Sequence, residues 1–316
     1  MSMTVRPDYF QGTCYFDSDL DLIACLDLIC ELLPIGDSWT FLNKSLFCGE
    51  VFDHSFRSIR GKLFGGFRRE HQQFKMILQV PGSYWSQLQS SHYLPFISFL
   101  LDCGFNPTRF DIALDDYKRR IDFNSIKKAG ELGHYRLVNS YKCIESAIVR
   151  GADLIPTCYF GSSDKMLRFY DAEVVHGILA DRWELQLRDN HARTVINDYL
   201  ENSESLGSFV TGAVDFGSYA SSSSLSFQRA NWWDSLRRAA NGAKKIELPS
   251  FEPCFEKSEN WLYNQVSPTL AVAFHGYGIK GFSSFLFDLI NEGTKRLKSY
   301  HIQWINELKK EFQTNG

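Results

Sequence analysis

The chain has 316 residues, of which 44% are hydrophobic and 22% are charged, and its formal net charge is −3. This composition supplies enough apolar material for a packed core and excludes disorder as a description of the whole chain. The slight negative charge argues against a generally basic, non-specific nucleic-acid binder, although basic residues can still gather on one face. No apolar stretch approaches the roughly 20 residues of a membrane span, and the first residues lack an export signal. We therefore expect a cytoplasmic protein with no membrane partner.

The spacing of apolar residues predicts the secondary structure, because apolar residues recur at helical intervals in helices and alternate in strands. In chain order, the first part is expected to contain a helix at 17–33, strands within 40–80, a helix at 82–103, a strand at 108–117, a helix at 124–131, and strands at 143–149, 155–160, 165–170 and 182–188. The part after residue 189 is expected to contain helices at 191–202 and 231–245, a serine-rich linker at 218–226, a strand at 244–250 and a mostly helical remainder up to residue 313.

This order of elements predicts an α+β fold, with an antiparallel sheet core flanked by helices and a mainly helical C-terminal part. The character of the sequence changes between residues 205 and 228, where serine is frequent. We therefore expect one unit over residues 1–205 and a second over residues 206–316.

The strand at 108–117 has the clearest alternation. It places Arg109, Asp111 and Asp115 on one face, around the small Ala113, and three apolar residues on the other. Carboxylate oxygens suit Mg²⁺ or Mn²⁺. On a regular strand Asp111 and Asp115 lie ~13 Å apart, so Asp111 is the better ligand and Asp115 binds directly only if the strand bends. The alternative is an edge strand with a solvated, charged face.

The strand at 182–188 alternates in the same way. Its polar face carries Arg182, Glu184 and Arg188, and its apolar face carries Trp183 and two leucines. If this strand pairs beside the first, Glu184 can face Asp111 and complete a metal site, and Arg188 can contact a phosphate. The alternative is an ordinary antiparallel strand with one solvated side.

A third segment runs from a Gly-Ser turn at residues 161–162 into the strand at 165–170. Arg168 and Tyr170 share one face of that strand. A tyrosine that attacks a phosphodiester needs help, because the pKa of a free tyrosine is about 10. A divalent ion or a nearby base can supply that help. The alternative is that Tyr170 is a packing residue.

Taken in order, these segments resemble the replication initiation factor family, which includes initiators of rolling-circle plasmids and of some filamentous phages, and relaxases of mobile elements. The matching residues are Arg109, Asp111, Ala113 and Asp115 in an Arg-x-Asp-x-Ala-x-Asp strand, Tyr159, Gly161, Ser162, Arg168, Tyr170 and Asp171 in a Tyr-x-Gly-Ser turn with an Arg-x-Tyr-Asp-Lys strand, and Arg182, Trp183, Glu184 and Arg188 in an Arg-Trp-Glu-x-x-x-Arg strand. Trp232, Trp233 and the segment 261–270 extend the likeness over about residues 100–275. The chain departs from the family pattern at Ala172 and Ser163, where most relatives carry basic residues.

The resemblance implies a metal-dependent enzyme that nicks and rejoins origin DNA through a tyrosyl-5′-phosphate intermediate. It implies that Tyr170 is the nucleophile, and that Arg168 and Arg188 stabilise charge on the phosphate. It further implies that Asp111 and Glu184, with Asp115 less surely, hold Mg²⁺ or Mn²⁺. Residues 1–205 would then be the nicking core, and residues 206–316 a region for DNA binding or oligomerisation.

The resemblance also implies partners: an origin duplex with a melted or hairpin region, a second copy of the chain, and a host helicase. Two alternatives remain open. One is an origin-binding protein without catalysis, which the departures at Ala172 and Ser163 favour, and the other is a metal-dependent nuclease that uses water. Tyr117 and Tyr159 also remain candidate nucleophiles. Because no two histidines are separated by one residue, a carboxylate metal site is expected, and His176 is expected to be a surface residue.

Basic residues that are expected to contact DNA lie in two groups. Near the predicted site they are Arg109, Lys165 and Arg182, and further along the chain they are Arg229, Arg237, Arg238, Lys244 and Lys245. Phosphate contacts would position the duplex, and neighbouring aromatic residues such as Trp232 and Trp233 could stack on melted bases. The alternative is solvated charge over a buried aromatic core.

Overall fold

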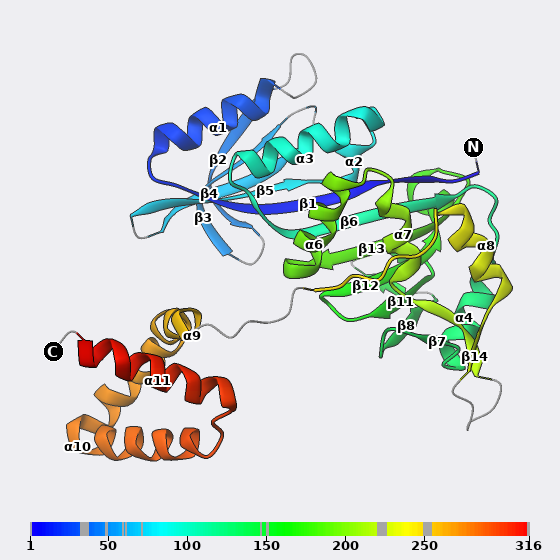
Figure 1. Ribbon diagram of the computed structural model, residues 1–316. Helices are drawn as coiled ribbons and strands as arrows, with labels where there is room; N and C mark the ends of the chain where they lie inside the picture. The colour runs from blue at the N-terminus through cyan, green and yellow to red at the C-terminus, as the bar shows by residue number, and fades with distance from the viewer. Residues whose placement is uncertain are drawn as a thin grey trace. The chain divides into compact units, whose positions relative to one another are not determined.

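An antiparallel sheet organises the N-terminal part of the chain (Figure 1). In spatial order its described strands are β2 (Trp39–Phe47), β3 (Glu50–Ser58), β4 (Phe64–Glu70), β5 (Gln73–Val80), β1 (Thr4–Phe16), β6 (Asn106–Asp116), β13 (Asp181–Arg188), β12 (Lys165–Asp171), β11 (Thr157–Gly161) and β8 (Tyr141–Ile144). Every neighbouring pair is antiparallel. The predicted α+β class with an antiparallel sheet is therefore confirmed.

The computed structural model describes most of the chain, and its contacts divide the chain into two compact units, Met1–Leu248 and Pro249–Gly316. The residues described are 2–31, 38–47, 50–58, 60, 62–70, 72–145, 147–149, 152–219, 226–248 and 255–314. The division lies after the expected boundary at 205–228, because the elements that follow residue 205 pack onto the sheet. The first unit is therefore larger than the expected 1–205, and the second is smaller than the expected 206–316.

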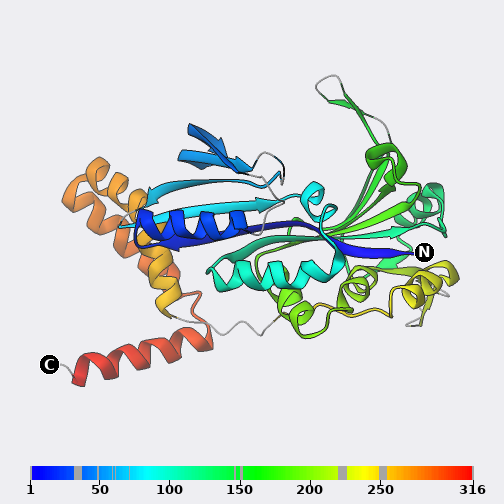
Figure 2. The same cartoon turned by 90° about the horizontal axis from the view of Figure 1, so that it is seen from above.

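Most helices of the first unit cover one face of the sheet, and the short α5 (Ala172–His176) lies by the other, beside Tyr170. The other helices of this unit are α1 (Asp19–Glu31), α2 (Gly82–Trp85), the 3₁₀ turn η1 (Ser90–His92), α3 (Tyr93–Asp102), α4 (Phe123–Glu131), α6 (Asp189–Glu201), α7 (Ser205–Gly212) and α8 (Asn231–Ala239). With the sheet nearly edge-on, Figure 2 shows α1, α3, α6 and α7 on the same side of it. Short strands complete the unit, namely β7 (Tyr135–Arg136), β14 (Asp215–Tyr219), β15 (Phe227–Arg229), and the hairpin of β9 (Ala147–Val149) and β10 (Ala152–Leu154).

The core lies between this helical layer and the apolar face of the sheet. Trp183 of β13 is fully buried, with its ring centroid 4.5 Å from Phe169 of β12 and 5.1 Å from Trp233 of α8. Trp233 packs against Phe216 as well. It is therefore a core residue, and the expectation that it stacks on DNA bases is wrong.

Several predicted elements differ in detail from the observed ones. The helix expected at 82–103 is interrupted between Trp85 and Ser90, and the helix expected at 231–245 ends at Ala239. Residues 244–248 form no strand, and residues 249–250 of that prediction lie outside the described residues, as do 220–225 of the serine-rich linker. The strand β1 was not predicted.

The second unit is helical over its described part, as expected. It contains α9 (Phe255–Trp261), a π-helical turn η2 (Leu262–Val266), α10 (Ser267–Thr294) and α11 (Ser299–Thr314). Gly278 breaks the regular geometry of α10 with φ of 67°. Across the part of the chain that the structure describes, no helix has the length and apolarity needed to cross a membrane.

Gly161 ends β11 and begins the turn to β12, with φ of +112°. A Cβ atom there would lie far inside van der Waals contact with the carbonyl oxygen of Lys165, whereas Gly133, with φ of +66°, has open space around it. A left-handed conformation alone costs a non-glycine residue about 1–2 kcal/mol. We expect Gly133→Ala to lower the free energy of unfolding by about that amount, and Gly161→Ala to lower it further, as measured by urea denaturation. Equal losses would contradict this account of the turn.

Candidate functional site

The strand register brings the three predicted segments together on the face of the sheet opposite the main helical layer, where the short α5 lies. Glu184 of β13 pairs with Ala113 of β6 on one side and with Arg168 of β12 on the other. Arg182, two residues earlier, pairs with Asp115 and with Tyr170. Because directly opposite residues of antiparallel strands share a face, these polar side chains lie on one face, opposite the buried Trp183.

Two buried carboxylates lie at the centre of this face. Asp111 is 1% exposed and Glu184 is 6% exposed. Nη2 of Arg168 lies 3.4 Å from Oδ2 of Asp111 and also contacts Oε1 of Glu184. One guanidinium nitrogen therefore reaches both carboxylates, so the two groups lie close enough to share a single cation. Arg109 also donates to Asp111, with Nε 3.0 Å from Oδ1.

Burial governs the ionisation of these acids. It raises the pKa of Asp111, although Arg109 and Arg168 partly oppose the effect. It raises the pKa of Glu184 to about 7, again against the attraction of Arg168. A pair of carboxylates in this setting favours any added positive charge, because such a charge relieves the cost of keeping both ionised.

Tyr170 of β12 points at the same carboxylate pair. Its hydroxyl donates to Oε2 of Glu184 at 2.9 Å and lies 3.3 Å from Nε2 of His176, at the end of α5. Burial, and then the negative charge of Glu184, raise the pKa of the Tyr170 hydroxyl. The phenol is therefore neutral in the resting site and needs a proton acceptor before it can act as a nucleophile. His176 is an exposed residue, as predicted, but its ring contacts this hydroxyl.

Asp115 is held away from the pair by Arg182. The Arg182 side chain donates to both oxygens of Asp115, at 2.6 and 2.9 Å, and both side chains are almost fully buried. The register of β6 with β13 is regular from Arg109 to Asp116, so β6 lacks the bend that would bring Asp115 close to Asp111. Asp115 is an ion-pair partner here. Because Arg182 is 1% exposed, its predicted contact with DNA is wrong.

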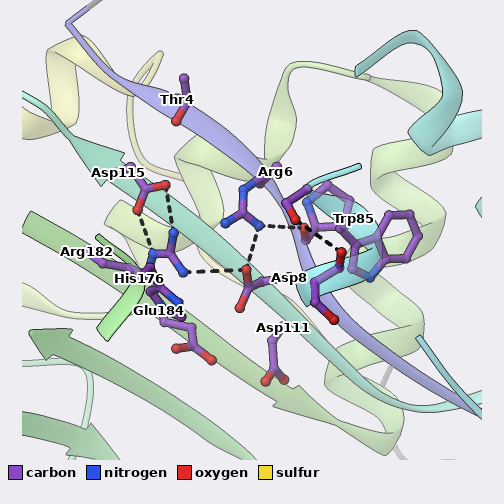
Figure 3. Close-up of polar contacts among 12 residues, drawn as sticks. Thr4, Arg6, Asp8, Trp85, Asp111, Asp115, His176, Arg182 and Glu184 are labelled. Carbon is purple, nitrogen blue, oxygen red and sulfur yellow. Dashed lines mark hydrogen bonds and ion pairs between the residues drawn. The ribbon is translucent and has the colours of Figure 1, made fainter. Parts of the chain in front are cut away.

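Asp8 is a fourth carboxylate of this face, and the sequence analysis missed it. The pairing of β1 with β6 shifts between Pro7 and Tyr9, so Asp8 is the extra residue of a β-bulge, a device that re-aims a side chain. Asp8 accepts a hydrogen bond from Arg6 at 2.6 Å and lies 3.7 Å from Nη1 of Arg182. Figure 3 shows Asp8, Asp111 and Glu184 on the same side of three neighbouring strands. The run of aromatic residues from Tyr9 to Phe16 was the available signal for β1, but its pairing partner lies too far along the chain to be inferred.

Of two further predicted residues, Arg188 lies near the site and Lys165 lies on the other face of the sheet. Arg188 pairs with Arg109 in the register, and its buried Nε has no hydrogen-bond partner among the described residues. Lys165 pairs with Leu187, so alternation places it on the opposite face from Tyr170. Burial and the nearby Lys245 lower the pKa of Lys165. Lys165 therefore lies away from the Tyr170 hydroxyl, and its predicted contact with DNA stays a prediction.

The second predicted basic group is largely engaged in ion pairs within the protein. Arg229 donates to Asp215 at 2.6 Å, and Arg237 lies 3.7 Å from the same carboxylate. Lys244 pairs with Asp198. Arg238 and Lys245 are exposed and remain the members of this group that are most accessible to a DNA backbone.

The pair of Asp115 and Arg182 yields a stability prediction. Arg182→Met is expected to lower the free energy of unfolding by about 3–5 kcal/mol, because it leaves a buried carboxylate unpaired. Combining it with Asp115→Leu should recover most of that loss. Urea denaturation without metal measures the free energy of unfolding of both variants. The control is Arg193→Met, because Arg193 bonds to the neutral side chains of Asn106 and Asn190. A double variant no more stable than Arg182→Met would refute the assignment.

Comparisons with known proteins assign the chain to a family. The model of the family described as replication initiation factor matches residues 105–290, more than half of the chain, and this span includes Asp111, Tyr170 and Glu184. The structure is similar to that of the rolling circle replication initiator protein from Geobacillus stearothermophilus, with a TM-score of 0.59 and 18% identity over 78% of this chain and 100% of that one. A search of curated proteins finds no significant match. The matched span shows that the chain belongs to the replication initiation factor family.

Proposed function

We propose that the protein initiates rolling-circle replication by nicking and rejoining one strand of origin DNA, with Tyr170 as the nucleophile. The observation that carries this proposal is the hydrogen bond from the Tyr170 hydroxyl to Glu184, a carboxylate that shares the cation Arg168 with Asp111. Tyrosine attack on a phosphodiester uses a phenol, a carboxylate that can accept its proton, and a pair of acids suited to a divalent ion. The family membership and the likeness to a rolling-circle initiator support the same conclusion.

In the proposed reaction, Oε2 of Glu184, which already accepts from the Tyr170 hydroxyl, takes its proton as the phenol oxygen bonds to phosphorus, while Oε1 faces the cation shared with Asp111. The bond from phosphorus to the 3′ oxygen breaks, and that oxygen takes up a proton and leaves as a free 3′-OH. The protein stays attached to the 5′-phosphate until a second transfer restores a continuous strand. The hydrogen bond of 2.9 Å between the two groups supplies the geometry that such a proton transfer needs.

Arginines would stabilise the charge that develops on the phosphate. Arg168 and Arg109 are the cations beside Tyr170 and Asp111, and Arg188 lies next to Arg109 in the register. Ala172, where most relatives carry a basic residue, is fully buried. We therefore assign the main electrostatic role to Arg168.

Asp111 and Glu184 would hold Mg²⁺ or Mn²⁺, because a single cation already reaches both of them. When bound, such an ion would polarise the phosphate. No group of three or more His, Cys, Asp and Glu side chains within the described residues is arranged to hold a metal. The remaining ligands would be phosphate and water oxygens, which is the usual way in which proteins bind Mg²⁺.

The proposed DNA partner is an origin duplex with a melted or hairpin region, met in the cytoplasm. A homodimer and a host helicase also belong to this proposal, but they rest on the family resemblance alone. Because Arg238 and Lys245 are exposed, we propose them, with Arg109, as the first candidates for contacts to DNA phosphates.

The nucleophile can be tested with labelled single strands and supercoiled DNA from the region that flanks the gene of this protein. In the presence of Mn²⁺, we expect a covalent protein–DNA adduct on a denaturing gel with the wild type and none with Tyr170→Phe. Tyr117→Phe, at an exposed tyrosine, is the matched control and should keep the adduct. Cleavage that survives Tyr170→Phe without an adduct would favour a water-using nuclease. DNA binding with neither nick nor adduct would favour the origin-binding protein.

The metal ligands can be tested separately from the nucleophile. EDTA should abolish nicking, and Asp111→Asn and Glu184→Gln should each weaken Mn²⁺ binding by at least about tenfold, since changes even to residues behind the ligands typically cost 10–100-fold. Calorimetric titration of Mn²⁺ measures this effect without relying on activity. Glu173→Gln, at an exposed acid of α5, should leave the affinity unchanged. Unaltered Mn²⁺ affinity in Asp111→Asn would remove that residue from the metal site.

A further inference from the structure

A pocket of about 230 Å³ opens directly beside Tyr170. Ile144 at the end of β8, Ile155 before β11 and Val175 on α5 supply apolar walls, and the ring of Tyr159 lines it as well. Tyr170 and Glu184 also line the pocket, so it connects with the proposed reaction site. None of the functions proposed above uses this space.

The lining indicates the kind of group that fits. Pockets for drug-sized ligands hold about 300–1,000 Å³, so this one suits a smaller, flat group with apolar faces. Tyr159 pairs with Arg168 in the strand register and therefore shares the face of the reacting residues. Within the described part of the chain, the Tyr159 ring makes no stacking or cation contact with another side chain, so its face is available to a ligand in the pocket. Aromatic rings in such positions stack on nucleic-acid bases.

We propose that this pocket binds the unpaired base of a nucleotide next to the scissile phosphate, with Tyr159 as its stacking platform. The inference rests on the proposed function, because a phosphodiester at the Tyr170 hydroxyl places a flanking nucleotide within reach of the pocket. A base that enters the pocket has to leave its pair and its stack. The pocket therefore selects melted DNA at the nick, and Tyr159 acts in substrate recognition.

The test uses a single strand that the wild type nicks, in which each nucleotide around the nick is replaced in turn by an abasic one. We expect one flanking position at which the abasic nucleotide lowers kcat/KM for nicking by about tenfold, and no effect at positions several nucleotides away. Tyr159→Ala should lower kcat/KM on intact DNA to a similar extent and remove the additional effect of the abasic nucleotide. Tyr159→Phe should behave as the wild type. Independent, additive effects of Tyr159→Ala and the abasic nucleotide would overturn the inference.

A second variant guards against misfolding of Tyr159→Ala. Val175 is 41% exposed, so Val175→Trp can fill the pocket from the surface, and it should slow nicking of intact DNA while having little effect on abasic DNA. The same substitution at Val174, which is 66% exposed and does not line the pocket, is the matched control. Equal slowing of both substrates by Val175→Trp would count against the pocket.

A binding measurement separates this inference from the proposed function. Tyr170→Phe protein is mixed with the same strand carrying 2-aminopurine at the sensitive position, and stacking on Tyr159 should quench its fluorescence. The quenching should disappear when Tyr159→Ala is added to Tyr170→Phe. Adducts on intact DNA together with unchanged fluorescence and a flat abasic scan would overturn the pocket alone. If no strand yields an adduct, the proposed function fails. Overlapping strands that carry 2-aminopurine then test the pocket independently, because quenching that depends on Tyr159 would support base binding and its absence would contradict it.

Discussion

The register of β13 between β6 and β12 is the constraint on which both the core and the candidate site depend. In this register Trp183 enters the core, and its neighbours Arg182 and Glu184 meet Asp115, Arg168 and the other polar residues of the opposite face. A slip of one residue would exchange the two faces of the strand. It would place charged groups among the rings of the core, so the apolar packing that stabilises the sheet also fixes the positions of the polar groups in the candidate site.

Charge balance on the site face links its resting state to its substrate. Asp111 and Glu184 are buried together, and Arg168 contacts both. Buried carboxylates need such partners, because an unpaired charge in this setting is strongly destabilising. A DNA phosphate that enters the site would compete with the carboxylates for the same guanidinium. Arrival of the phosphate and release of the carboxylates from Arg168 would then be coupled events, and the acids would become available to another cation as the phosphate binds.

Much of this site could be predicted from local alternation, and the rest depended on contacts between distant segments. Alternation was sufficient to place Asp111, Glu184 and Tyr170 on polar strand faces, and the spacing along the strand already separated Asp111 from Asp115. The same alternation separates Lys165 from Tyr170, because the two residues are an odd number of positions apart on β12. The sequence could not reveal that a bulge aims Asp8 at the site, because the bulge depends on the pairing of β1 with β6, which lie about 100 residues apart along the chain.

The central position of β1 has a consequence for how the protein is made and handled. This strand is the first of the chain, yet it joins the β2–β5 part of the sheet to the part that begins with β6. During synthesis it must wait for partners that end at residues 80 and 116 before it can pair on both sides, and such non-local pairing slows folding. Removing residues 1–16 would therefore both divide the sheet and eliminate Asp8. A defect in such a shortened protein would reflect failure of the whole first unit to assemble, and it could not be attributed to the loss of Asp8 alone.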